Sequence, residues 1–351
     1  KILGSKVQGL HHAEEIAATK LRMAGLYEQQ LGDFDRAGKV YREVLELDGS
    51  NISALRGLER VYQTIQDWPD LVAILERQLD VVETERERVE VLLKIAQHQE
   101  EHFLKFDVAA QRYEQALEIF HAEERAYQGL ERCYRRLKQW LDLINAYERH
   151  ISEAAGTATK VELYAAIAQV YAEEVSDVDR AIDAYRNIVD LDDTNVPALE
   201  ALSKLYEKQG DAAQAIESMT RVADLTTDGG QRVEMYYRIG KALEEKLGDR
   251  GQAQIIMDEA LKVAESRGSE VELQLRRGMA RYFVSVDDAP RAIDAYRQVL
   301  ARAPESHDDR VSAAELLSMS DATLNLAREE LLLVLGSDLR HAPAYRLLVS
   351  V

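Results

Sequence analysis

Apolar residues recur along the chain every three or four positions, which is the spacing that places side chains on one face of an α-helix. Leu199, Leu202 and Tyr206 share such a face. Gly210 and Asp211 then end one helix and cap the next, after which the apolar stripe resumes. No segment shows sustained two-residue alternation with β-branched enrichment. The pattern therefore predicts an all-α fold without a sheet.

Capping residues support the same helix boundaries. Asn51 and Asn195 are suitable N-caps for the helices that follow them. Pro69, Pro197 and Pro290 fall in predicted first turns, where a missing amide hydrogen costs little. We predict that the remaining two prolines lie between helices; they are Pro304 and Pro343.

One small or apolar position recurs nine times, at successive spacings of 34, 38, 34, 38, 34, 38, 39 and 35 residues. Because the spacings alternate, the true unit is a pair of repeats, 72 residues long. The members of this alanine column are Ala37, Leu71, Ala109, Leu143, Ala181, Ala215, Ala253, Ala292 and Ala327.

A second column lies four residues after the first, on the same helical face, and a third lies about ten residues before it. These two columns contain eleven of the sixteen tyrosines, so we predict that the tyrosines serve mainly in packing. The second column is Tyr41, Leu75, Tyr113, Tyr147, Tyr185, Met219, Met257, Tyr296 and Leu331; the third includes Tyr27, Tyr62, Tyr134, Tyr171, Tyr206 and Tyr282.

Two stretches carry a family resemblance. Gly32-Asp33-Phe34 with Ala37 and Tyr41 resembles the tetratricopeptide repeat. Residues 198–206, followed by Gly210-Asp211, resemble it as well. The resemblance implies about eight to nine helix-turn-helix repeats, stacked as a right-handed α-α superhelix whose first helices line a concave groove. We expect a single solenoid over 1–351, with repeats from about residue 13, cut from a longer array like those of large bacterial proteins. The uneven spacing departs from the family pattern: the longer repeats have one extra residue between the first-helix tyrosine and the turn.

Composition narrows the function. Acidic residues outnumber basic ones 63 to 44, and the resulting charge of −19 disfavours nucleic-acid binding. No apolar run is long enough to cross a membrane. The single cysteine, Cys133, lies on an apolar helix face and is expected to be buried. We expect a cytoplasmic protein; a periplasmic location stays open because the sequence starts at Lys1 without Met.

Two histidines resemble a metal motif. His98-Gln99-Glu100-Glu101-His102 places two imidazoles four residues apart on one helical face, with Glu101 as a candidate base. The same segment also matches ordinary positions of a first helix. We therefore predict neither a catalytic residue nor a cofactor, and keep His98 and His102 as a weak candidate for a metal site.

The predicted groove carries a local basic cluster. Residues 125–138 contain five basic residues and one acid, within a strongly acidic chain. Guanidinium groups bind carboxylates and phosphates bidentately, so the cluster could select an acidic partner; the alternative is a solvated helix face balanced by neighbouring glutamates. The candidate partner-binding residues are Arg56, Arg60, Gln63, Arg125, Gln128, Arg132, Arg135, Arg136, Glu200 and Lys204.

The leading hypothesis is a non-enzymatic scaffold that holds a peptide or helix of another protein in this groove. One alternative is a regulatory superhelix that senses a small peptide; a metal-dependent enzyme and a helical-repeat RNA binder are weaker ones. The final segment, Ala344 to Val349, begins a first helix that lacks a capping partner. We expect this end to favour end-to-end self-association.

Overall fold

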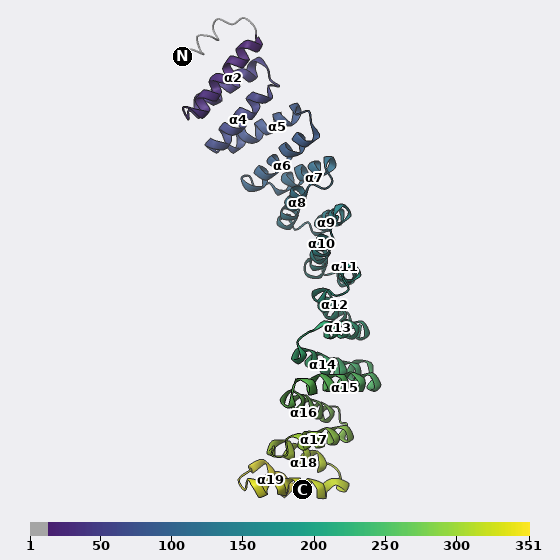
Figure 1. Ribbon diagram of the computed structural model, residues 1–351. Coiled ribbons are helices and arrows are strands. Elements are labelled where there is room, and N and C mark those ends of the chain that lie inside the picture. Colours follow the sequence, from purple (N-terminus) through teal and green to yellow (C-terminus); the bar gives the residue numbers. More distant parts are fainter. Residues whose placement is uncertain (1–12) are drawn as a thin grey trace. The chain divides into compact units, whose positions relative to one another are not determined.

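The computed structural model describes residues 13–351, which form a succession of helices (Figure 1). No strand occurs within this range, which confirms the all-α prediction. The helices are α2 (Ala13–Gln29), α3 (Phe34–Leu47), α4 (Ile52–Ile65), α5 (Trp68–Val81), α6 (Glu85–Glu101), α7 (Phe106–Ile119), α8 (Glu124–Leu137), α9 (Trp140–Glu153), α10 (Thr157–Gln169), α11 (Val178–Leu191), α12 (Val196–Gln209), α13 (Ala212–Leu225), α14 (Gly229–Leu247), α15 (Arg250–Arg267), α16 (Ser269–Ser285), α17 (Ala289–Arg302), α18 (His307–Leu317), α19 (Leu324–Ser337) and α20 (Ala342–Ser350).

The contacts divide the chain into two compact units, Lys1–Asp177 and Val178–Val351. In the first unit, α2 packs on α3, α4 on α5, α6 on α7 and α8 on α9. In the second, α12 packs on α13, α14 on α15, α16 on α17 and α18 on α19. These eight packed pairs agree with the predicted number of helix-turn-helix repeats. We call the earlier member of each pair its first helix, and α10 occupies the same place in the repeat order.

The alanine column is buried between the packed helices. All nine of its residues are buried, including the two leucines. In the second column seven of nine residues are buried, whereas Tyr185 and Met219 are half-buried. Small residues let helix backbones approach, and the tyrosines and leucines one turn later fill the space beside them. The prediction that most column tyrosines serve in packing is confirmed.

Two kinds of turn account for one of the four residues by which the repeat spacing alternates. In a shorter repeat, the Asp67 amide donates to the Tyr62 carbonyl, five residues back, at 2.9 Å. In a longer repeat, the Asp33 amide donates to the Tyr27 carbonyl, six residues back, also at 2.9 Å. The extra residue predicted from the sequence thus lies in the turn after the first helix, where the last hydrogen bond spans six residues instead of five. Both turns require one residue in the left-handed region.

The helix caps and the proline positions agree with the sequence predictions, with one exception. The side chains of Asn51 and Asn195 accept hydrogen bonds from the Ala54 and Ala198 amides, as expected of N-caps. Pro343 was predicted to lie between helices, and this is wrong: it lies in the first turn of α20. A proline is as well tolerated there as in a loop, because the first amides of a helix have no intrahelical acceptor.

Candidate functional site

Two cavities lie along the first helices of the first unit. The α6–α8 cavity, of about 500 Å³, is bordered by Lys94, Arg125 and Arg132 together with Glu90 and Glu101. Its charged lining is net positive by one. A second cavity is its neighbour, because Gln128 borders both.

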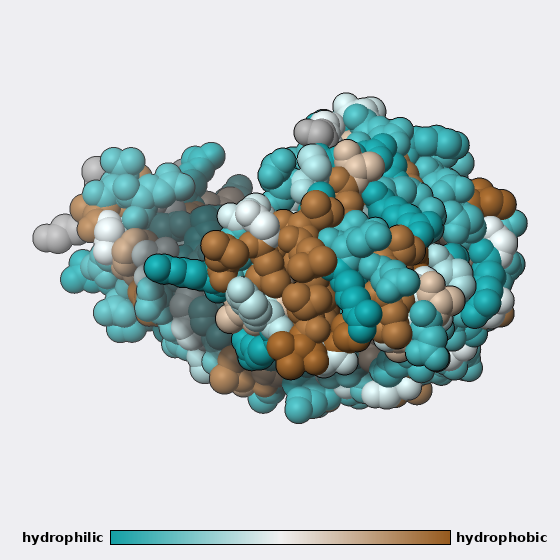
Figure 2. Space-filling view, turned by 90° about the horizontal axis from the view of Figure 1, so that it is seen from below, coloured by the Kyte–Doolittle hydropathy of each residue, from teal (hydrophilic) through white to brown (hydrophobic). Residues whose placement is uncertain are grey.

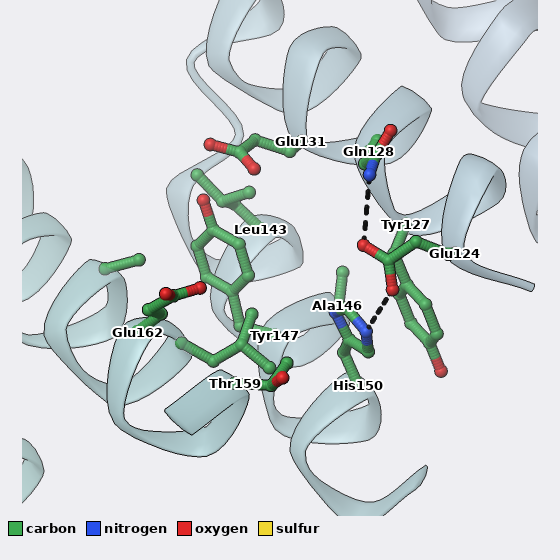
Figure 3. Close-up of a pocket in the computed structure, with 12 residues that line it drawn as sticks. Glu124, Tyr127, Gln128, Glu131, Leu143, Ala146, Tyr147, His150, Thr159 and Glu162 are labelled. Atoms are coloured by element: carbon green, nitrogen blue, oxygen red, sulfur yellow. Dashed lines mark hydrogen bonds and ion pairs between the residues drawn. The ribbon is translucent and has the colours of Figure 1, made fainter. Parts of the chain in front are cut away.

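The α8–α10 cavity, of about 280 Å³, has the opposite character. Three carboxylates border it, from Glu124 and Glu131 on α8 and Glu162 on α10. Figure 3 shows Tyr147 between Glu131 and Glu162, with the His150 ring and Glu124 on the other side of the site. The remaining wall is apolar and includes Leu143, Ala146, Leu163 and Ala166. Tyr127 stacks on His150 with ring centroids 4.2 Å apart, which closes the floor.

Most of the predicted arginines lie on first helices of this unit. Two of them, Arg60 and Arg132, are each held by a glutamate that also accepts a hydrogen bond from a tyrosine. Arg60 donates to both carboxylate oxygens of Glu28, at 2.7 and 3.0 Å, while Tyr41 donates its hydroxyl to the same carboxylate at 2.7 Å. The Arg60 guanidinium is the main reason why the pKa of Glu28 is lowered. Burial, reinforced by the nearby carboxylate, raises the pKa of Tyr41 to about 12.

The same arrangement recurs 72 residues later. Arg132 donates to both oxygens of Glu100, at 2.7 and 3.0 Å, and Tyr113 donates to Glu100 at 3.1 Å. Gly57 and Gly129 make room for the two tyrosine rings: a Cβ there would lie 2.4 Å from the Tyr41 ring and 2.3 Å from the Tyr113 ring. The double repeat therefore conserves a complete set of contacts as well as a spacing.

Three other predicted arginines also have carboxylate partners within the chain. Arg125 donates to both oxygens of Glu90, at 3.0 and 2.6 Å, and this contact is the chief cause of the lowered pKa of Glu90. Arg56 donates to Glu87 at 2.5 Å, and Arg135 donates to Glu131 at 3.0 Å. The basic cluster seen in the sequence is therefore largely balanced by glutamates of the same and neighbouring helices.

The other predicted groove residues are spread more widely. Gln63 and Arg136 are exposed near the ends of α4 and α8, and Gln128 donates to Glu124 at 3.1 Å. Arg136 has no ion pair with the described residues. Glu200 and Lys204 lie on α12 in the second unit, beside a cavity of about 190 Å³. The structure brings Arg125, Gln128 and Arg132 together, whereas the α12 residues belong to the other unit.

The histidine pair forms an aromatic stack. The ring of His102 lies 3.8 Å from that of Trp68 and nearly parallel to it, and His98 stacks beside both. Burial lowers the pKa of His98. Within residues 13–351 no group of three or more histidine, cysteine or acidic side chains is placed to hold a metal ion. In this arrangement the histidines cover the half-buried face of Trp68.

Apolar side chains gather at the C-terminal helices. Figure 2 views the molecule from the side on which these helices lie in Figure 1, and brown residues cluster there. Leu332, Leu333, Leu339 and Val349 are exposed. Self-association through this face stays a prediction. None of the helices between residues 13 and 351 is both long and apolar enough to cross a membrane.

This architecture is that of a helical-repeat protein, in which successive helix pairs bury their apolar faces against their neighbours. Sequence models of the tetratricopeptide repeat match residues 18–51, 54–89, 198–233 and 233–267. These residues therefore form tetratricopeptide repeats.

Relatives are distant. Human outer dynein arm-docking complex subunit 4 is 24% identical over 164 residues, which are 44% of this chain and 24% of that protein. The chain thus spans about a quarter of the length of this relative. Among solved structures, MamA matches 48% of this chain and 95% of its own, with 22% identity and a TM-score of 0.31. The structure of Naa15/Naa10 bound to HypK-THB matches 95% of this chain and 61% of that chain, with 12% identity and a TM-score of 0.45.

Sequence reasoning missed the carboxylates of the α8–α10 cavity. Glu124, Glu131 and Glu162 do not stand out in so acidic a chain, and the sequence predicts binding at the arginines beside them instead. Comparison of residues 72 positions apart could have found this site, because two cations are lost there. Lys94 corresponds to Ala166, and Arg56 corresponds to Gln128.

Proposed function

We propose that this protein is a non-enzymatic interaction scaffold, and that the first helices α6, α8 and α10 form the surface that binds a segment of another protein. The observation that carries the proposal is that two neighbouring cavities, both bordered by Gln128, lie along three successive first helices. Stacked helices form a preorganised surface, so a partner would not have to order it on binding.

The charge distribution supports a partner segment of mixed character. Arg125 and Arg132, predicted from the sequence, would face an acidic group together with Lys94, which the structure adds. Because the two arginines already pair with Glu90 and Glu100, they contribute directional hydrogen-bond donors more than unbalanced charge. Arg136, exposed at the end of α8, extends this basic side of the surface.

Site-specific photo-crosslinking tests the proposal. A photoreactive amino acid placed at Gln128 should capture a partner protein in cells of the source organism, and mass spectrometry would identify it. The control position is Gln115, which is exposed on α7, a second helix. Equal capture at both positions, or capture at Gln115 alone, would contradict the assignment of the surface.

The acidic-group part of the proposal has a separate test. Arg136→Glu should weaken binding of the captured partner by about two- to fivefold at low salt, corresponding to a rim charge contribution of roughly 0.4–1 kcal/mol. Lys39→Glu, an equal charge change at an exposed position of α3, is the control. Unchanged affinity for Arg136→Glu would remove Arg136 from the binding surface.

A further inference from the structure

The surface of the first helices loses positive charge from one double repeat to the next, 72 residues later. Along α4, α6 and α8, three cations pair with carboxylates: Arg56 with Glu87, Lys94 with Glu59, and Arg125 with Glu90. The contacts are short, at 2.5, 2.6 and 2.6 Å. In this stretch Glu59, Glu87 and Glu90 each have a cation from an adjacent first helix.

Seventy-two residues later the cations are gone. The positions equivalent to Arg56, Lys94 and Arg125 hold Gln128, Ala166 and Pro197. Two of the three carboxylates remain, since Glu59 is matched by Glu131 and Glu90 by Glu162, and Glu87 is replaced by Thr159. Glu124 adds another carboxylate where the earlier repeat has Ile52.

Internal contacts restore only part of the balance. Arg135, at the position of Gln63, pairs with Glu131 at 3.0 Å. Glu124 contacts the Nε2 of His150 at 2.9 Å. Glu162 is exposed and has no ion pair with any described residue. Of the groups that line the α8–α10 cavity, three are carboxylates and none is a lysine or arginine.

Position 166 holds alanine, whereas the equivalent position of the preceding double repeat holds Lys94, and the shorter side chain leaves space. The cavity of about 280 Å³ lies where the equivalent of the Lys94 side chain would reach. This volume is below the range of about 300–1,000 Å³ typical of small-molecule sites, and it suits one long side chain. Tyr147, Leu143 and Leu163 offer an apolar wall for a methylene stem, and the carboxylates lie at the polar end.

We infer that the α8–α10 cavity binds a lysine or arginine side chain of a partner protein, in the place that Lys94 occupies in the preceding double repeat. This inference rests on the proposed function and adds the chemistry of one anchor residue. The partner cation would contact Glu162 and Glu131, and its stem would lie against Tyr147. Charge complementarity would select a basic side chain over an acidic one at this position and fix its orientation.

The direct test uses a fluorescein-labelled peptide of alternating glycine and lysine, with a glycine–glutamate peptide as the opposite-charge control. Fluorescence anisotropy should show binding of the lysine peptide to the full chain. Ala166→Lys should abolish this binding, because the new side chain fills the cavity and pairs with Glu131. Glu131→Gln combined with Glu162→Gln should weaken it about tenfold.

A matched variant separates a specific site from general attraction to an acidic protein. Glu148→Gln combined with Glu153→Gln removes the same charge from exposed positions of α9 outside the cavity. It should retain binding within about twofold. An equal loss in both double variants, or no binding of the lysine peptide to the parent chain, would overturn the inference. Circular dichroism and the unfolding midpoint show that each variant is folded.

Failure of the inference can be told from failure of the proposed function. If a partner is still captured at Gln128 after Ala166→Lys, with unchanged affinity, the surface binds proteins but the cavity takes no basic anchor. If Gln128 captures nothing, the proposed surface is wrong whatever the lysine peptide does.

Discussion

At the residue scale, the tyrosines packed against glycines carry the most specific structural information. The Tyr113 ring occupies the space that a side chain at Gly129 would need, and its hydroxyl completes the Glu100–Arg132 contact. A small residue at 129 thus fixes both the packing and the ion pair. The equivalent position in the next double repeat is Ala201, and the matching Tyr185 is only half-buried. The glycine and the deep position of the tyrosine ring are lost together.

Gly129→Ala should destabilise the protein by about 2 kcal/mol, because a Cβ 2.3 Å from the Tyr113 ring forces the ring or the helix to shift. Urea unfolding followed by circular dichroism would measure the change. Gly25→Ala on α2 is the control, since a Cβ there meets nothing within 4 Å. Gly25→Ala should be neutral or slightly stabilising. Equal effects of the two substitutions would contradict the packing argument.

Cys133 should be unreactive in the folded protein. It is completely buried, and burial raises the pKa of its thiol to about 12, so almost no thiolate is present near neutral pH. A thiol reagent with a chromogenic leaving group should label the chain only after unfolding in guanidinium. Rapid labelling under native conditions would show that α8 opens locally at low cost.

At the element scale, the turns between first and second helices show which features a single sequence can and cannot predict. The extra residue of the longer repeats is visible in the spacing from Tyr27 to Gly32, and the structure confirms it. Gln66, Leu104 and Lys138 occupy left-handed positions that glycine fills elsewhere. Residues other than glycine disfavour the left-handed conformation, so their sequence does not predict turns at these positions. Packing of the flanking helices outweighs that preference.

The end of α10 was less predictable. The helix continues as a π-helical segment over Val170–Val175, and Ser176 then adopts a left-handed conformation with φ of 61°. The columns place Tyr171 correctly in the buried face, but apolar periodicity cannot distinguish a π-turn from an ordinary helical end. The ion pairs of the first helices were equally hidden, because they join residues about 32 to 35 positions apart.

Leu104→Gly should stabilise the protein by about 1 kcal/mol. Leu104 has φ of 54° and its side chain is exposed, so glycine relieves the backbone strain and sacrifices little burial. Gly210→Ala is the reciprocal control: its φ of 88° is unfavourable for alanine, although a Cβ would meet nothing within 4 Å. Thermal and urea unfolding should give opposite signs for the two variants. A destabilised Leu104→Gly would mean that this turn is not strained.

At the scale of the whole molecule, buried tyrosines of both units link stability to alkaline pH. Burial is the first cause that raises the pKa of Tyr41, Tyr236 and Tyr282 to about 12, from an ordinary value of 10.0. Since the folded pKa exceeds the unfolded one, the stabilising contribution of each phenol is complete below pH 10. It is lost as the pH rises from 10 through about 12.

Alkaline unfolding should therefore precede or accompany ionisation of the buried tyrosines, so the last part of the phenolate absorbance should appear together with loss of helical circular dichroism between pH 10 and about 12. Lysine deprotonation in the same range also weakens ion pairs, so a tyrosine variant is needed to isolate the effect. Tyr282 is suitable, because its hydroxyl is buried and has no hydrogen-bond partner among the described residues. Tyr282→Phe should raise stability at neutral pH by about 1 kcal/mol, since a desolvated hydroxyl is removed, and should shift alkaline unfolding to higher pH. If the complete phenolate absorbance of the sixteen tyrosines appears near pH 10 while the helices stay intact, the buried tyrosines are accessible to solvent and their burial does not control the stability of the repeat array.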